Sequence, residues 1–221
     1  MSDVYPSVEE LPVLSRLALS YAPKVAREKT LGLLALDARL AGIVRSASEP
    51  MLAQLRLAWW RDQFAKPISD WPEGEPLLAT LKAWREQARA LGGLVDGWEH
   101  LAGEGPLPAN DFSALASARG DAFGALAILL GADDAREECK VAGREWALAD
   151  LLSRVSAPEE TVALRELAGK AAFGPIRLPR AMRPLALLHG LARKAMDSGR
   201  SLDDLPPSAL LKALRIGLVG R

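Results

Sequence analysis

The densest group of residues able to bind a cation is acidic and lies between positions 133 and 138. Asp134 and Glu138 are four residues apart, so a helix would carry both carboxylates on one face, where their oxygens suit a hard cation such as Mg²⁺. Acids are also favoured in the first turn of a helix by the positive end of its dipole. We predict this second, structural role, and we interpret the pair Asp203 and Asp204 in the same way.

The other residue types with catalytic potential do not form a recognisable set. His100 and His189 are far apart and have no companions that suggest a triad. The single cysteine, Cys139, has no Cys or His at metal-ligand spacing and indicates a reducing compartment. The chain contains no Gly-x-Ser-x-Gly elbow, P-loop or Gly-x-Gly-x-x-Gly fingerprint. We therefore predict no metal site and no catalytic residue among these groups.

Charge is balanced along the chain, with 28 Lys and Arg against 28 Asp and Glu. A net charge of zero removes the electrostatic basis for nucleic-acid binding. One local basic concentration, Lys170 with Arg177, Arg180 and Arg183, suits either an anionic lipid or diphosphate, or simply the exposed loop of a neutral protein.

The location expected from the sequence is cytoplasmic. The N-terminal residues are acidic and lack the apolar stretch of a signal peptide. The longest nearly uninterrupted apolar run, 122–132, is shorter than the roughly 20 residues that span a bilayer, so we predict a core helix there. Peripheral contact with the inner face of a membrane stays open.

The elements that must position these residues are predicted to be helices throughout. Apolar residues make up 49% of the chain and charged residues 25%, which is typical of a globular protein. Apolar residues recur at spacings of three and four, and alternation with period two is absent. We predict an all-α, single-domain bundle over 1–221, with its core at about 13–200 and about eight helices. The principal segments expected to be helical are 13–22, 25–45, 50–65, 77–90, 94–101, 113–130, 133–155, 157–170, 184–197 and a short helix after Pro206.

Local signals predict where several of these helices begin, end and approach one another. Ser48, Asn110 and Ser156 are expected to cap helices with their side chains. The pair Gly92-Gly93 is expected to interrupt a helix, and Gly199 to stop one. Gly120 and Gly124, although each costs about 1 kcal/mol of helix propensity relative to alanine, would let two helices pack closely.

The segment 50–65 carries a stripe of Leu52, Leu55 and Trp59. Trp59 and Trp60 point about 100° apart on a helix, so one stripe cannot hold both. We expect one indole in the core and the other against a neighbouring helix or a partner, in preference to a lipid or cofactor pocket.

Three stretches, in this order and spacing, resemble the squalene/phytoene synthase family. The first is 34–64, LALDARLAGIVRSASEPMLAQLRLAWWRDQF, with its Ser-Glu-Pro break and Trp-Trp helix. The second is 94–101, LVDGWEHL, followed by 112–126, FSALASARGDAFGAL. The third is 143–155, GREWALADLLSRV, followed by 174–179, GPIRLP. Together they cover most of residues 20–200, and the resemblance implies the isoprenoid synthase type of helical bundle.

Active members of that family condense two prenyl diphosphates, and aspartates on two facing helices hold the Mg²⁺ that binds the leaving diphosphate. At the first site this chain has Gly42, Ile43 and Ser46 where acids are expected. Asp37 is the only acid between Glu28 and Glu49, so a D-x-x-x-D pair cannot form there.

The second site departs from the family pattern in a different way. Where the family has asparagine, arginine and aspartate, this chain has Asp150, Ser153 and Arg154. Arg154 therefore sets a cation where a metal ligand belongs. From the resemblance we assign possible substrate-binding roles to Asp37, Arg39, Asp150, Arg154 and Arg177, with no catalytic residue, no metal ligand and no cofactor.

The function expected on these grounds is that of a relative that has lost Mg²⁺-dependent prenyl transfer. The resemblance extends to the branch of the family that assists assembly of respiratory complex I, which points to a protein partner, or to a prenyl or other lipid ligand in an apolar cavity. The alternative is an active prenyl diphosphate transferase, with Mg²⁺ held by Asp37 and Asp150 alone. A third interpretation is a helical interaction module without a ligand.

Overall fold

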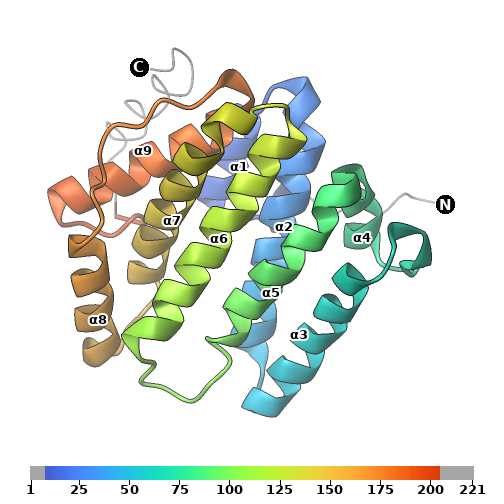
Figure 1. Ribbon diagram of the computed structural model, residues 1–221. Helices are drawn as coiled ribbons and strands as arrows, with labels where there is room; N and C mark the ends of the chain where they lie inside the picture. Colours follow the sequence, from blue (N-terminus) through green and yellow to red (C-terminus); the bar gives the residue numbers. More distant parts are fainter. Residues whose placement is uncertain (1–7, 205–221) are drawn as a thin grey trace.

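The computed structural model describes residues 8–204, and every regular element within them is helical. Two long helices, α6 (Ala109–Leu129) and α7 (Arg136–Leu152), run antiparallel and side by side through the middle of the bundle (Figure 1). On one side α6 packs against α5 (Leu91–Glu99), and on the other α7 packs against α9 (Arg183–Ser198). The predicted all-α class is confirmed.

The remaining helices surround this central pair. The long helix α2 (Lys24–Ser46) packs against α5 and supports α4 (Pro76–Leu81), while α1 (Val13–Ser20) lies against α9 and α2. At one edge of the bundle α3 (Pro50–Ala65) packs on α5, and at the opposite edge α8 (Pro158–Gly169) packs on α7 (Figure 1). The short 3₁₀ segments are η1 (Val8–Glu10), η2 (Ile68–Asp70), η3 (Lys82–Ala90), η4 (Asp133–Ala135) and η5 (Arg180–Met182).

Glycines allow the close approach of α6 and α7, as the sequence predicts. A Cβ atom added at Gly120 would lie 2.6 Å from the backbone oxygen of Lys140, and one at Gly124 would lie 2.6 Å from the Lys140 side chain. On the facing helix, a Cβ at Gly143 would lie 2.9 Å from the Phe123 ring. Because backbone meets backbone at Gly120, no side-chain rearrangement could make room there.

Two expected helix boundaries are wrong. The segment 77–90 is not one helix: α4 ends at Leu81 and η3 follows, with Arg85 at φ 49°. Just before this break Trp84 is fully buried and donates its indole N–H to the Lys29 carbonyl at 3.0 Å. The pair Gly92-Gly93 lies inside α5 and does not interrupt it. Tertiary packing outweighs local helix propensity at both places.

The predicted side-chain caps are also wrong, whereas the helix end predicted at Gly199 is confirmed. The N-cap residues of α3, α6 and α8 are Glu49, Pro108 and Ala157, and none of them makes a side-chain cap hydrogen bond. Both α3 and α8 begin at a proline, which loses nothing there because a first-turn N–H has no helical partner. Gly199 ends α9 at φ 65°. The short helix expected after Pro206 lies outside the described residues.

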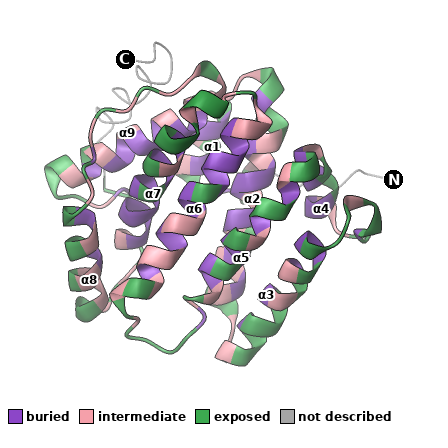
Figure 2. Ribbon diagram, viewed as in Figure 1, coloured by how far each residue is buried: buried purple, intermediate pink, exposed green. Residues whose placement is uncertain are grey.

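Helix α6 is long and apolar enough to cross a membrane by length and composition alone, and it is the one such helix in residues 8–204. Its most apolar window is 61% buried within the bundle (Figure 2). This burial is typical of a core helix, which is what the apolar run 122–132 predicts.

Candidate functional site

The most unusual feature of the core is a buried guanidinium, that of Arg119 on α6. Its Nε and Nη2 donate to the two carboxylate oxygens of Asp37 on α2, at 2.9 and 2.8 Å. Its Nη1 donates to Oδ2 of Asp150 on α7, at 2.9 Å. The side chain of Arg119 is only 3% exposed. One arginine thus joins three helices through two carboxylates.

Two indoles enclose this guanidinium. The Cζ atom of Arg119 lies 5.0 Å from the ring centre of Trp98 and 4.9 Å from that of Trp146, within cation–π range on both sides. Trp98 also donates its N–H to Oδ1 of Asp37 at 2.8 Å. The aromatic rings cover the guanidinium on two sides and favour one orientation of its plane.

A second arginine completes the group from the edge of the cluster. Arg154, one turn after Asp150 on α7, donates Nε to Oδ2 at 3.0 Å and Nη2 to Oδ1 at 2.7 Å of that carboxylate. Its side chain is 42% exposed, against 10% for Asp150. Two carboxylates therefore meet two guanidiniums, and the cluster carries no net charge.

The electrostatics of the cluster follow from this pairing. Burial by itself would raise the pKa of Asp150, but the charge of Arg119 and the hydrogen bonds from Arg154 and Arg119 hold that pKa below its ordinary value. For Arg119, burial acts to lower the pKa, and the charges of Asp37 and Asp150 overcome it, so the pKa of Arg119 lies above its ordinary value. Asp150, Arg119 and Arg154 are therefore ionised at neutral pH.

Asp150 makes the stability of the fold depend on acidity. Near pH 4 the folded protein holds fewer protons on Asp150 than the unfolded chain does, so the free energy of unfolding falls as the pH falls. The contribution of Asp150 is complete above the unfolded pKa of about 4 and is lost as the pH falls through the lower folded value.

We therefore expect Asp150→Asn to cost most at neutral pH and progressively less below about pH 4. Urea unfolding of wild type and variant at a series of pH values measures this. Asp62→Asn, at an exposed carboxylate without an ion pair in the described residues, is the matched control. If the loss of stability caused by Asp150→Asn did not change with pH, the lowered pKa assigned to Asp150 would be wrong.

Space around the cluster lies at the side of the bundle rather than in its centre. A cavity of about 230 Å³ opens beside the cluster under α1, lined by Arg119, Asp150 and Arg154 among others. Next to it, a cavity of about 320 Å³ is lined by Arg39, Gly42 and Arg56. Inside the bundle, the space between Arg119, Phe123 and Trp146 measures about 10 Å³, which is room for about one water molecule.

The five residues assigned from the resemblance thus separate into three places. Asp37, Asp150 and Arg154 come together in the cluster. Arg39 lies in the neighbouring cavity, half-exposed, with its Nη1 3.6 Å from Oε2 of Glu75. Arg177 is exposed on the segment 171–179 and lines neither of these two cavities.

Three residues of the cluster were not assigned from the sequence: Arg119, Trp98 and Trp146. All three lie inside the stretches that carry the family resemblance. The available signal is Arg119 itself, a lone cation within the small and apolar run FSALASARGDAFGAL. A charged residue on the buried side of a helix needs partners of opposite charge, and Asp37 and Asp150 are the buried aspartates in the described residues.

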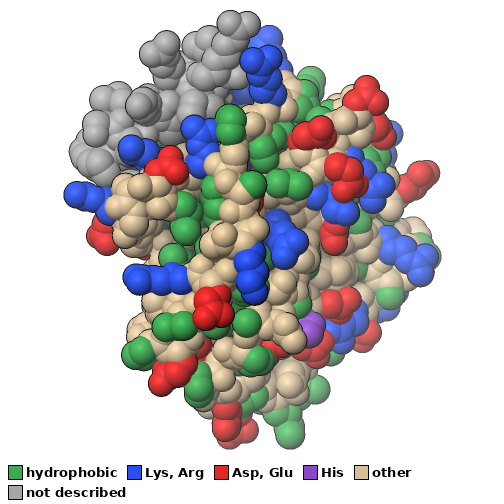
Figure 3. All heavy atoms as spheres, turned by 60° about the vertical axis from the view of Figure 1, so that its left-hand side comes forward, with side chains coloured by type: hydrophobic (Ala, Val, Ile, Leu, Met, Phe, Trp, Pro, Cys, Tyr) green, Lys and Arg blue, Asp and Glu red, His purple; other side chains and the backbone are tan. Residues whose placement is uncertain are grey.

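The other groups considered in the sequence have structural roles. Asp133 and Asp134 in η4, and Glu137 and Glu138 in the first turn of α7, are exposed, as predicted. His100 lies on the surface, 3.0 Å from Asp111. Basic and acidic side chains are interspersed on the face that carries α8 and the segment 171–179, without a continuous basic patch (Figure 3).

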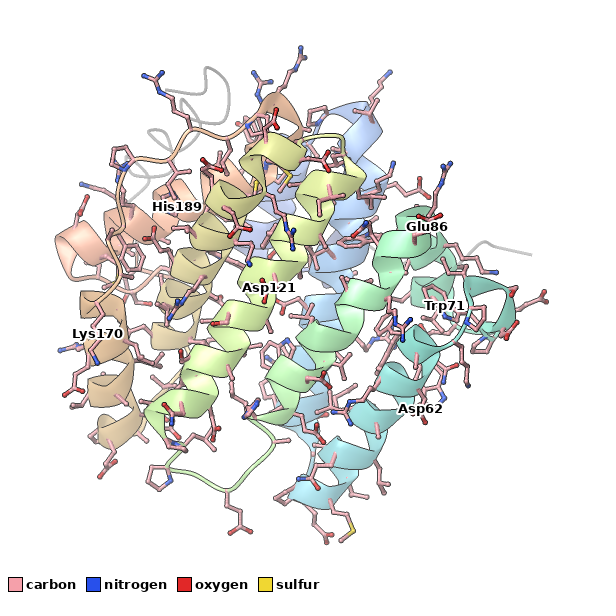
Figure 4. All side chains as sticks on the ribbon, viewed as in Figure 1. Asp62, Trp71, Glu86, Asp121, Lys170 and His189 are labelled. Atoms are coloured by element: carbon pink, nitrogen blue, oxygen red, sulfur yellow. The ribbon has the colours of Figure 1, made fainter. Side chains whose placement is uncertain are left out.

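His189 belongs to a second buried polar group. Its Nε2 lies 2.6 Å from Oε2 of Glu145 on α7, and Oε1 of Glu145 accepts the backbone N–H of Phe173 at 2.8 Å. Phe173 has φ 44°. Glu145 therefore links α7, α9 and the segment before η5, on the left-hand side of the bundle where His189 is labelled (Figure 4).

The family resemblance implies a bound Mg²⁺, but the residues at the cluster do not suit a metal ion. Every oxygen of Asp37 and Asp150 accepts an N–H donor from Arg119, Arg154 or Trp98. A metal ion bound between these carboxylates would have to displace a buried guanidinium. Elsewhere in residues 8–204, no group of three or more His, Cys, Asp and Glu side chains could hold a metal ion.

The fold and the site together define an all-α bundle with a buried, charge-neutral aspartate–arginine cluster between its central helices. Comparisons with models of protein families, with curated proteins and with solved structures found no match.

Proposed function

We propose that this protein is a non-catalytic relative of the squalene/phytoene synthases that acts by binding a protein partner, in the manner of a respiratory complex assembly protein. The observation that carries the proposal is the cluster: the acids on α2 and α7, the helices that resemble the two metal-binding helices of the family, are neutralised by Arg119 and Arg154. Cations stand where the reaction would need carboxylates free to bind metal.

The burial of Arg119 supports this interpretation further. Freeing Asp37 for a metal ion would leave a buried guanidinium without its main partner, at a cost of several kcal/mol. The transferase alternative would need that rearrangement in every catalytic cycle. The space of about 10 Å³ between the central helices has no room for a lipid chain, so a lipid would have to occupy the side cavities of about 230 and 320 Å³.

Loss of prenyl transfer is tested directly with the purified protein. Incubated with farnesyl or geranylgeranyl diphosphate and Mg²⁺, it is expected to release no diphosphate and to form no condensed hydrocarbon. Asp150→Ala is the matched variant, expected to give the same background. Turnover by the wild type that Asp150→Ala abolishes would overturn the proposal and support the transferase.

The assembly role has its own measurement. Deletion of the gene is expected to lower the amount of assembled respiratory complex I, and expression of the wild-type chain to restore it. An unchanged amount of complex I after deletion would remove the assembly role.

A further inference from the structure

Helix α3 carries an exposed apolar stripe on the face turned away from the core. The exposed fractions are 67% for Met51, 46% for Leu52, 62% for Leu55 and 41% for Trp59. The opposite face of α3, which includes Leu57, Trp60 and Phe64, is buried. An α-helix with apolar residues on both faces normally has partners on both, but α3 lies at the edge of the bundle (Figure 1).

Contacts within the chain fix the position of α3 and of its Trp59 ring. The ring of Trp59 stands edge-on to that of Trp60, with centres 5.0 Å apart, and Trp60 stacks on Phe64 at 6.0 Å. On the flank, Arg61 pairs with Asp96 and Glu99 of α5, which fixes α3 against the bundle. A braced tryptophan among exposed leucines is the kind of residue that contributes most to protein interfaces.

From this arrangement we propose that α3 is the contact surface of a homodimer, in which two copies of α3 pack antiparallel about a two-fold axis at Leu55. Met51 and Trp59 lie equally far before and after Leu55, so each Met51 would be level with the Trp59 of the other copy. Leu52 would be level with Ala58, and Leu55 would meet its own copy on the axis. An isologous interface needs such a self-complementary patch.

The charges within α3 are compatible with this register. With the axis at Leu55, the exposed Arg56 is level with the uncharged Gln54 of the other copy, and the exposed Asp62 lies beyond Pro50, where α3 of the other copy begins. Glu49 and Asp62 are exposed acids at the two ends of the stripe (Figure 4 labels Asp62), and Arg56 is the one exposed cation among the residues between them.

The size of the stripe predicts a weak dimer. Four side chains with these exposures present on the order of 400 Å² of surface, which is within the size range of the largest apolar patch on a typical monomer. With its rim, an α3 pair would bury on the order of 1,000 Å² in total, at the lower end of specific interfaces, so we expect a Kd on the order of micromolar.

Sedimentation of the full chain over about three decades of concentration around the micromolar range tests the proposal. The wild type is expected to pass from monomer to dimer, and Leu55→Glu to remain monomeric at every concentration while keeping its helical circular dichroism. Val162→Glu, at a residue 57% exposed on α8 across the bundle, is the matched control and is expected to dimerise like the wild type. A monomeric wild type, including one that instead binds phosphatidylglycerol vesicles through Leu55, would overturn the homodimer, as would a Leu55→Glu dimer.

Cysteine cross-linking tests the register. Leu55→Cys is expected to give a disulfide-linked dimer on mild oxidation, and so is a mixture of Met51→Cys and Trp59→Cys chains, whereas Met51→Cys alone gives much less. The native Cys139 does not interfere, because burial and the nearby Glu138 raise its thiol pKa to about 12. A cross-linking yield of Leu55→Cys no higher than that of Met51→Cys alone would overturn the antiparallel arrangement.

Discussion

Arg119→Met is expected to lower the free energy of unfolding by about 3–5 kcal/mol, the cost of leaving buried charges without their partner. Asp37 would lose both guanidinium hydrogen bonds and keep only the Trp98 N–H, and Asp150 would keep only Arg154. Urea unfolding followed by circular dichroism measures the loss. Arg56→Met removes an exposed arginine and is expected to change stability by less than about 0.5 kcal/mol.

Two further variants keep this prediction testable if Arg119→Met does not fold. Arg119→Lys retains the charge but cannot form the planar fork or stack between two indoles, so an intermediate loss of stability is expected. In the pair Asp37→Asn with Arg119→Met, the double variant is expected to be more stable than the sum of the single effects predicts, because the two residues interact directly. Additive effects, or an Arg119→Met that loses less than about 1 kcal/mol, would show that the cluster stabilises little.

Gly120→Ala is expected to lower the free energy of unfolding by about 1–3 kcal/mol, even though alanine is the better helix former. The new methyl group would lie 2.6 Å from the Lys140 carbonyl oxygen, so α6 and α7 would have to separate along their closest contact. That separation would also shift Arg119, the preceding residue, away from its carboxylate partners.

Gly42→Ala is the matched control, because it makes the same substitution within α2 where no atom lies within 4 Å of the added Cβ. Here only the propensity gain remains, and stability is expected to rise by about 0.5–1 kcal/mol. Thermal unfolding of the wild type and the two variants measures this: the change in stability should be negative for Gly120→Ala and positive for Gly42→Ala. A Gly120→Ala protein as stable as Gly42→Ala would mean that the interhelical contact can relax.

The candidate site was partly predictable from the sequence. Asp150 and Arg154 were singled out because the resemblance marked their positions, and Asp37 because it is the only acid between Glu28 and Glu49. The structure brings these three together. Arg119 gave no comparable signal. A single arginine has no periodicity, and whether it faces solvent or the core depends on how α6 is rotated against α2 and α7, which no local pattern records.

The sequence by itself determined the helical class and most helix positions, because apolar spacing of three and four residues, prolines at first turns and the glycine after α9 act over a few neighbouring residues. Only the tertiary structure decided the break at Arg85, the continuity of α5 through two glycines, and the identity of the outward face of α3. Leu52, Leu55 and Trp59 form a clear stripe in the sequence, yet Leu57, Trp60 and Phe64 form another on the same helix. Which stripe is buried depends on the surface that α5 and α2 offer, and that surface exists only once the bundle has formed.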